Sequence, residues 1–349
     1  MGNRVGKTFF NTLFSSGKQG GRWPQASRRR QRYGLSITAG HHRSMKIRTV
    51  LGDIPPEEFG LALVHEHILC DFIGADRVSR SRYDPREVFN VMLPYLNEIK
   101  QLGVSGFVDC TPAFIGRDPW LLASLSKASG IHILTNTGLY KEPFLPKYAF
   151  EYSVEQLASM WVSEIEQGVE ETPVKAGFVK IAVNPGRIIP IQRKIVRAAA
   201  RCSLSTGAAI VCHTASGVAA MDLLNMVEEE GLDPARVIVA HCDSEEDWNY
   251  HLEILQRGAW VEYDSISEAT SAKVLNMIRL VVENGFSSRL LLSQDAGWYN
   301  VGENKGGSIR PYSYLVKHFI PIMLREGLSR SLVDQVLIKN PAQAFQIRG

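Results

Sequence analysis

The sequence predicts an α/β protein that folds as a single (β/α)8 barrel. Its 349 residues exceed the roughly 250 that such a barrel commonly needs. From residue 60 onward, short apolar runs alternate with amphipathic stretches, which is typical of βα units and a parallel sheet. Reactive residue types fall at the carboxyl ends of the predicted strands, where barrel enzymes gather their active sites.

Eight strands are expected from β-branched or apolar runs bounded by turn residues. They span residues 61–67, 106–110, 132–138, 176–183, 209–214, 237–242, 259–264 and 290–295. Helical periodicity separates them, most clearly over 88–102, 154–168, 194–206, 218–230 and 272–284. Capping residues or glycines mark several helix ends, as at Ser153, Gly168, Gly207 and Gly231. We therefore expect one barrel domain over residues 45–349.

The first strand carries two histidines that can share a metal ion. In His65-Glu66-His67, strand alternation places both imidazoles on one face and Glu66 on the other. Taken alone, such a pair is more often two satisfied core histidines than a ligand pair, because short motifs produce false matches. Further histidines and an aspartate at other strand ends, however, favour a metal site.

Two more histidines and an aspartate end other predicted strands. His213 and His241 each follow an apolar run, where an unpartnered polar group is costly to bury, and Asp295 ends the eighth strand. Four imidazoles and a carboxylate suit zinc, and also manganese, iron, cobalt or nickel. Asp264, at the end of the seventh strand, is interpreted either as a hydrogen-bond partner of a ligand imidazole or as a strand cap.

Lys180 is the most unusual residue of the set. It lies inside the apolar run Gly-Phe-Val-Lys-Ile-Ala-Val, where desolvation disfavours its charge unless a partner or a modification compensates. A Schiff-base aldolase would also place a nucleophilic lysine there. The four histidines argue against this alternative, because aldimine chemistry has no need of them.

Taken in order, the sequence motifs resemble those of one family. They are Val-His-Glu-His (64–67), Ile-Gly-Arg-Asp (115–118), Thr-Gly-Leu-Tyr (137–140), Gly-Phe-Val-Lys-Ile (177–181), Cys-His-Thr (212–214), Ala-His-Cys-Asp (240–243), Ser-Gln-Asp (293–295) and Asn-Pro-Ala (340–342). On these motifs the chain resembles the phosphotriesterase family of the amidohydrolase superfamily, including its phosphotriesterase-related proteins and phosphotriesterase-like lactonases. The resemblance runs from about residue 50 to residue 345 and implies an amidohydrolase-type TIM barrel.

The resemblance implies a centre of two divalent metal ions, with zinc first among the candidates. It assigns them six ligands, which are His65, His67, Lys180, His213, His241 and Asp295. His65, His67 and Asp295 would bind the more buried ion, and His213 and His241 the more exposed one. Lys180, carboxylated by carbon dioxide, would bridge both ions together with a hydroxide. Carboxylation would also convert the buried, uncompensated Lys180 cation into an anion.

The implied activity is metal-dependent hydrolysis of an ester bond by the bridging hydroxide. Asp295 would take up the proton on attack, and Tyr140 matches the aromatic residue that the lactonases place over the metal centre. We expect a lactone or carboxyl ester as substrate first, an amide such as an N-acylated small acid second, and an organophosphate triester as a side reaction. A metal-binding barrel without catalysis is the alternative from another class, and the complete ligand set argues against it.

Two positions depart from the best-known members of the family. Organophosphate-hydrolysing members carry an aspartate shortly after the sixth-strand histidine and a histidine just after the seventh-strand aspartate. This chain has Ser244 and Ser265 there, and lactonases often have an arginine at the latter position. These two positions therefore do not assign the chain to either subgroup, although Tyr140 matches the lactonases.

The segment after the last strand, up to residue 310, is rich in glycine and aromatic residues, as expected of a lid over the barrel mouth. Trp298 and Arg310 are expected to shape the substrate pocket together with Tyr140. An ordinary surface loop with a packed tryptophan is an equal alternative. If Lys141, Lys305 or Arg310 faced the metals, an anionic substrate would be favoured.

The first 44 residues form a basic segment with nine lysines and arginines and no acidic residue. It is interpreted as a disordered leader or as the product of a start codon upstream of Met45, with twin-arginine export at Arg29-Arg30 as a weaker alternative. The remaining 30 basic and 36 acidic residues predict no nucleic-acid partner. No apolar run approaches the roughly 20 residues of a membrane span.

Five cysteines without close pairs favour a reducing, cytoplasmic compartment. The expected partner is a small-molecule substrate. The family resemblance is also compatible with a homodimer.

Overall fold

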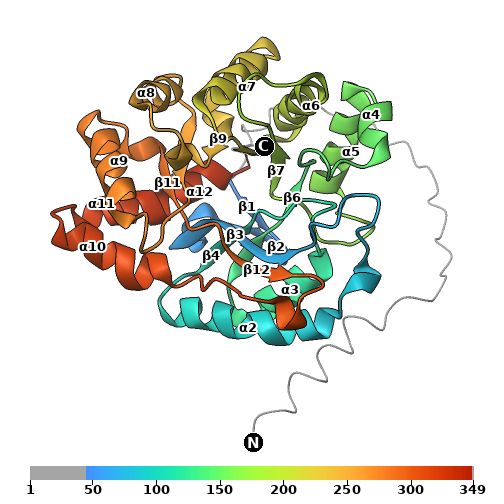
Figure 1. Ribbon diagram of the computed structural model, residues 1–349, viewed down its shortest axis with the longest axis horizontal. Coiled ribbons are helices and arrows are strands. Elements are labelled where there is room, and N and C mark those ends of the chain that lie inside the picture. The colour runs from blue at the N-terminus through green and yellow to red at the C-terminus, as the bar shows by residue number, and fades with distance from the viewer. Residues whose placement is uncertain (1–44, 348–349) are drawn as a thin grey trace, which may run out of the picture. The chain divides into compact units, whose positions relative to one another are not determined.

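The computed structural model describes residues 45–347, which form a closed barrel of parallel strands surrounded by helices (Figure 1). The predicted (β/α)8 architecture is confirmed. The interpretations placed on residues 1–44 lie outside the described residues. No helix within 45–347 is both long enough and apolar enough to cross a membrane.

The barrel contains eight strands, two of which are interrupted. The segments are β3 (Ala62–Cys70), β4 (Gly106–Asp109), β5 (His132–Leu134), β6 (Asn136–Thr137), β7 (Phe178–Ala182), β8 (Ile210–His213), β9 (Val237–Ala240), β10 (Trp260–Tyr263), β11 (Leu290–Leu292) and β12 (Ala296–Asn300). Each pairs in parallel with its neighbour in chain order, and β5 and β6 together form the third strand. The ring closes where β12 returns to β3, with Ala296 opposite Glu66.

Helices connect the strands on the outside of the barrel (Figure 1). They are α2 (Pro85–Gln101), α3 (Pro119–Ser129), α4 (Lys147–Glu151), α5 (Val154–Glu166), α6 (Pro190–Thr206), α7 (Gly217–Glu229), α8 (Trp248–Gln256), α9 (Ser271–Glu283), α10 (Ile320–Arg325), α11 (Arg330–Asp334) and α12 (Asn340–Phe345). π-Helical turns precede α10 and α12, at Leu315–Phe319 and Gln335–Lys339. An antiparallel hairpin of β1 (Ile47–Thr49) and β2 (Gly52–Ile54) comes before the barrel.

Helix ends form at residues that the sequence marks for them. The Ser153 side chain accepts from the backbone N–H of Gln156, and the Gln156 side chain accepts from the backbone N–H of Ser153. α5 therefore begins with a capping box. Gly207 ends α6 in the left-handed conformation, with φ 72°, which glycine adopts without a Cβ clash. Such local signals explain why the predicted helix boundaries lie close to the observed ones.

Two strands end earlier than the apolar runs suggest. β9 stops at Ala240 because His241 adopts φ 61°, and β11 stops at Leu292, shortly before Asp295 with φ 50°. The segment expected to be a lid loop then begins as a strand, because β12 pairs with β3. The lid interpretation was therefore wrong for residues 296–300.

The apolar core fills the amino-terminal end of the barrel. Inward-facing side chains of the strands pack there against α12, where the Phe178 and Phe345 rings meet edge to face at 5.5 Å between centroids. Burying a side chain of this size contributes roughly 1.5–3 kcal/mol. The polar side chains are left to the opposite, carboxyl-terminal end of the strands.

Candidate metal centre and active site

A cavity that opens to solvent lies at the carboxyl ends of the strands. Its lining contains all six predicted ligands and two of the three predicted pocket residues. The lining residues are His65, His67, Phe72, Cys110, Pro112, Ile115, Tyr140, Lys180, His213, His241, Asp295 and Trp298. The structure thus brings together side chains that are up to 233 positions apart in the chain, from His65 to Trp298.

His65 is buried in β3 and is held from both sides. Its Nδ1 lies 3.0 Å from Oε1 of Glu262 and 3.0 Å from Oδ2 of Asp264. Its Nε2 lies 3.1 Å from Nζ of Lys180. Because the two carboxylates occupy Nδ1, the Nε2 lone pair is the one available toward the cavity.

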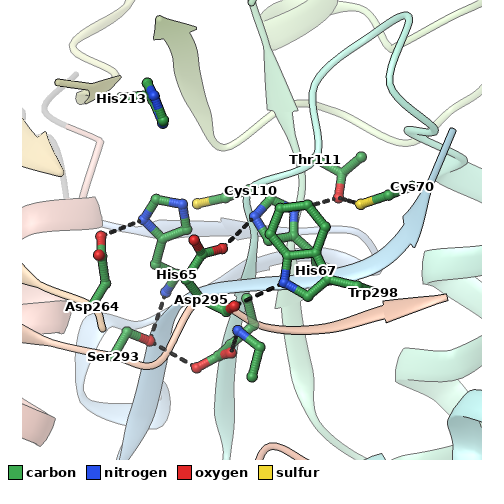
Figure 2. A network of polar contacts seen from close by, with 12 residues as sticks. His65, His67, Cys70, Cys110, Thr111, His213, Asp264, Ser293, Asp295 and Trp298 are labelled. Atoms are coloured by element: carbon green, nitrogen blue, oxygen red, sulfur yellow. Dashed lines mark hydrogen bonds and ion pairs between the residues drawn. The ribbon is translucent and has the colours of Figure 1, made fainter. Parts of the chain in front are cut away.

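His67 lies on the same face of β3, as strand alternation predicts. Its Nδ1 lies 2.8 Å from Oγ1 of Thr111, and its Nε2 lies 3.0 Å from Oδ1 of Asp295. That Asp295 oxygen is buried and has no hydrogen-bond partner. Burial lowers the pKa of His67 to about 4, so the imidazole is neutral at pH 7. Figure 2 shows Asp295 and His67 facing each other.

His213 and His241 lie close to this pair. The His241 ring centroid is 4.8 Å from that of His65 and 4.4 Å from that of His213. His213 Nδ1 lies 3.1 Å from the Tyr140 hydroxyl. Burial, followed by the neighbouring His241, lowers the pKa of His213 to about 2. The four predicted ligand imidazoles therefore converge at one end of the barrel.

Asp264 contacts two of these imidazoles, and Figure 2 shows its contact with His65. Besides His65, it contacts Nδ1 of His241 at 2.7 Å and accepts from the His241 backbone N–H at 3.0 Å. Of the two interpretations of Asp264, the hydrogen-bond partner is confirmed. Sequence reasoning missed Glu262, although a glutamate two residues before Asp264 in an apolar strand must face the same way.

Glu66 points away from the histidines, yet it also supports the site. Its carboxylate accepts from the Ala296 backbone N–H at 2.7 Å and from the Ser293 hydroxyl at 2.9 Å. Burial raises the pKa of Glu66 to about 7. Since these partners flank Asp295 in sequence, Glu66 fixes the turn that presents Asp295. This role, too, was missed from the sequence.

Two glycines allow the backbone to approach the predicted ligands closely. A Cβ on Gly138, at φ 107°, would lie 2.2 Å from the carbonyl oxygen of Lys180. A Cβ on Gly297, at φ 98°, would lie 2.0 Å from the carbonyl oxygen of His67. Only glycine satisfies both requirements at these positions.

Three larger residues at the site also adopt positive φ. These are His241 at 61°, Asp295 at 50° and Trp298 at 74°. Such conformations cost on the order of 1–3 kcal/mol each and persist where the surroundings over-determine them. Their concentration around one cavity is typical of a functional site.

Four aromatic side chains at the cavity form a continuous series of ring contacts. We name this set the aromatic rim, and it comprises Trp298, Phe72, Phe144 and Tyr140. Successive ring centroids are 5.6, 5.5 and 6.1 Å apart. The rim begins over His67, 4.2 Å from Trp298, and ends at His213, 5.3 Å from Tyr140.

The third predicted pocket residue lies elsewhere. Nη2 of Arg310 donates to the backbone carbonyl of Ile266 at 2.7 Å, and the Arg310 backbone pairs with that of Gly297. Arg310 is not among the residues that line the cavity within the described part of the chain. It connects β12, at Gly297, to the turn after β10, at Ile266.

A sequence profile of the phosphotriesterase family matches residues 45–345. The chain belongs to the phosphotriesterase family. It is 31% identical to the phosphotriesterase homology protein of Escherichia coli (strain K12), over 82% of this chain and 98% of that protein. It is 25% identical to an N-acetyltaurine hydrolase of Tetraodon nigroviridis, over 86% of this chain and 97% of that protein.

A solved structure of a lactonase from Listeria monocytogenes is also similar. The TM-score is 0.77 at 26% identity, covering 87% of this chain and 100% of the lactonase chain. Family membership and these relatives identify the chain as a metal-dependent hydrolase. They also confirm the TIM barrel that the motifs implied.

The two serines that depart from the family pattern have local roles. Ser265 donates to Asp243 through its backbone N–H at 2.8 Å and through its hydroxyl. The Ser244 hydroxyl donates to the His241 backbone carbonyl at 2.6 Å. Both stabilise the turns after β9 and β10.

The donor set fits divalent cations. The ligand atoms of His65, His67 and Asp295 lie within 4.8 Å of one another, and those of His65, His241 and Asp264 form a second such group. Asp295 Oδ1 has no hydrogen-bond partner and lies beside the neutral imidazole of His67. A cation bound between them would satisfy both groups. These histidines and aspartates could therefore hold metal.

Proposed function

We propose that this family member is a binuclear metal-dependent hydrolase that cleaves a lactone or a carboxyl ester. The observation that carries the proposal is the convergence of four imidazoles, a carboxylate and a buried lysine on one cavity. Zinc is the first candidate, since it accepts imidazole and carboxylate ligands without a strict geometric demand.

We assign His65, His67 and Asp295 to the more buried ion and His213 and His241 to the more exposed ion. The 3.0 Å approach of Asp295 Oδ1 to His67 Nε2, without a hydrogen bond, supports the first set. The low pKa values of His67 and His213 support one ligand in each set, because a ligand imidazole must be neutral.

Lys180 would bridge the two ions as a carbamate. Its side chain is 1% exposed, lies 3.1 Å from His65 Nε2 and has no ion pair with a described carboxylate. A buried ammonium without a counterion is unfavourable. Reaction with carbon dioxide would replace this cation by an anion and thereby match two facing dications.

When bound, the two ions would supply hydroxide at neutral pH and polarise the carbonyl group of the substrate. Asp295 would accept the proton released on attack. Burial raises the pKa of Tyr140, so its hydroxyl stays protonated and can donate a hydrogen bond to the leaving oxygen. The aromatic rim would cover the substrate and limit access of water.

A second candidate is hydrolysis of an amide such as an N-acylated small acid. The similarity to an N-acetyltaurine hydrolase favours it, whereas the lactonase structure favours the ester. Hydrolysis of phosphotriesters is proposed only as a side reaction, because Ser244 and Ser265 replace the residues that organophosphate-hydrolysing members carry.

The test is metal analysis of the purified full chain, combined with a substrate panel of lactones, carboxyl esters, N-acylated acids and a phosphotriester. We expect two metal ions per chain and the highest kcat/KM on a lactone or ester. Fastest turnover of an N-acylated acid would select the amidase. If the metal-loaded protein hydrolysed none of these substrate classes, the alternative of a metal-binding barrel without catalysis would be supported instead.

We further propose a cytoplasmic location, a single domain over residues 45–349 and a homodimer. All five cysteines are buried and unpaired, as in a reducing compartment. Analytical ultracentrifugation at several protein concentrations would test the dimer.

A further inference from the structure

Lys141 is a half-buried cation beside the candidate metal centre, in the loop between β6 and α4. Its Nζ lies 3.1 Å from Nε2 of His213 and 5.6 Å from the centre of the Tyr140 ring. No carboxylate of the described residues forms an ion pair with it. The loop therefore places an uncompensated positive charge at the end of the aromatic rim.

Two buried arginines of this barrel have carboxylate partners. Arg117 lies 2.9 Å from Glu164 and 3.0 Å from Glu170, and Arg48 lies 2.8 Å from Asp53. A charge that loses water without such a partner costs free energy. Lys141 is not itself a lining residue of the cavity, but its Nζ contacts His213, which is one. An external anion bound beside His213 could remove this cost.

His213 cannot hold Lys141 and a metal ion through the same nitrogen. Nε2 of a neutral imidazole with Nδ1–H has one lone pair, which either accepts from an ammonium or binds a cation. If His213 is a ligand, as proposed above, the ammonium is released from it. Lys141 then remains at the cavity edge with its hydrogen-bond donors free.

We propose that Lys141 binds an anionic group of the substrate. This inference rests on the proposed hydrolase function and narrows its substrate to a lactone, ester or amide that carries a carboxylate, phosphate or sulfonate. An ammonium pairs with any of these oxyanions as a point charge. The apolar remainder of the substrate would lie along Trp298 and Phe72, at the other end of the rim.

The other cations near the cavity are unavailable for this role. Lys180 is 1% exposed and lies against His65. Arg310 is engaged with the Ile266 carbonyl. Of these three described cations, Lys141 is the one whose hydrogen-bond donors become free when His213 binds a metal ion.

The experiment compares kcat/KM on two lactones that differ only in one carboxylate, with a phosphate-bearing third compound. The variants are Lys141→Gln and Lys141→Arg, with Lys147→Gln as the control because Lys147 is 91% exposed in its side chain. In the wild type we expect the anionic lactones to be preferred by roughly ten-fold or more, the effect of a charged hydrogen bond. The carboxylate and phosphate arms identify which anion is preferred.

Lys141→Gln should abolish most of that preference through a higher KM, while Lys141→Arg and Lys147→Gln retain it. Calorimetry with the anionic hydroxy-acid product gives a second readout, and its Kd should rise by about ten-fold in Lys141→Gln. A wild-type enzyme that hydrolyses both lactones equally, or an unchanged preference in Lys141→Gln, would overturn the role of Lys141 alone. Metal-loaded wild type that hydrolyses no member of the panel would instead overturn the proposed function.

Discussion

Asp264 shows how one carboxylate can set the chemistry of two imidazoles. By accepting at Nδ1 of both His65 and His241, it fixes the tautomer in which Nε2 is unprotonated. Glu262 contacts the same nitrogen of His65 at 3.0 Å. The two predicted ions would therefore share a common support at the carboxyl end of β10, although β10 contributes no predicted ligand itself.

Lys180→Ala should lower metal content and activity together, because it removes the proposed bridge. We expect kcat to fall by two or more orders of magnitude, about 3 kcal/mol in the activation free energy. Elemental analysis and kinetics on the best substrate of the panel provide the measurement. A short carboxylic acid in the medium should restore part of both, since it can occupy the position of the carbamate.

The matched control is Lys147→Ala, which changes an exposed lysine and should preserve metal content and rate. Wild-type metal content and turnover in Lys180→Ala would reject the bridge.

At the scale of elements, the junction between β12 and β3 is the place where the barrel closes and Asp295 is positioned. Gly297→Ala should therefore destabilise the fold strongly, because its Cβ would meet the His67 carbonyl oxygen at 2.0 Å. We expect a loss of about 3 kcal/mol or more in the free energy of unfolding, from backbone strain together with overpacking. Urea denaturation monitored by circular dichroism measures it.

Gly302→Ala separates these two causes. Gly302 has nearly the same φ, 97°, but nothing lies within 4 Å of an added Cβ. Its cost should be about 1 kcal/mol, the strain alone. Equal losses in both variants would show that the close approach at His67 does not limit the substitution.

The pairing of α6 with α7 predicts a pH dependence. Glu230 bonds to Arg197 at 2.6 Å and Arg201 at 2.7 Å, and the Arg201 hydrogen bond lowers its pKa below the ordinary 4.5 despite desolvation. Since the folded pKa is the lower one, this stabilisation is complete above pH 4.5 and is lost as pH falls below it. Glu230→Gln should cost about 1 kcal/mol at pH 7 and less at pH 4.

Unfolding in urea at the two pH values tests this expectation. Asp334→Asn, in the exposed pair with Arg330, serves as the control and should change stability by less than about 0.5 kcal/mol. A penalty for Glu230→Gln that grows toward low pH would contradict the assignment.

The elements also show what the sequence can reveal. Strands could be predicted because a buried strand requires a run of apolar residues. Most candidate ligands could be predicted because they are histidines or an aspartate at the ends of such runs. β12 was missed because the glycine and aromatic residues of this segment suggested a loop, and the structure shows that Gly297 and Trp298 do adopt positive φ within the strand. The roles of Glu66 and Lys141 depend on residues more than 70 positions away, at Ala296 and His213, which no local pattern encodes.

At the scale of the whole molecule, the candidate ligands come from all around the barrel, from β3, β7 and β8 and from the turns after β9 and β11. Ions bound there would connect strands that are distant in the chain. The folded state alone presents this site, so bound metal should add RT ln(1 + [L]/Kd) to stability, about 4 kcal/mol at a thousand times Kd.

Removal of the metal with a chelator should therefore lower Tm by roughly 10 °C, and zinc should restore it. Differential scanning calorimetry of the full chain measures the shift. His213→Asn should show a smaller chelator effect than the wild type, because it removes a proposed ligand of the exposed ion while His65, His67 and Asp295 remain. If elemental analysis shows complete metal loss without any change in Tm, the ions do not connect the strands of the barrel, and the ligand set would have to be reassigned.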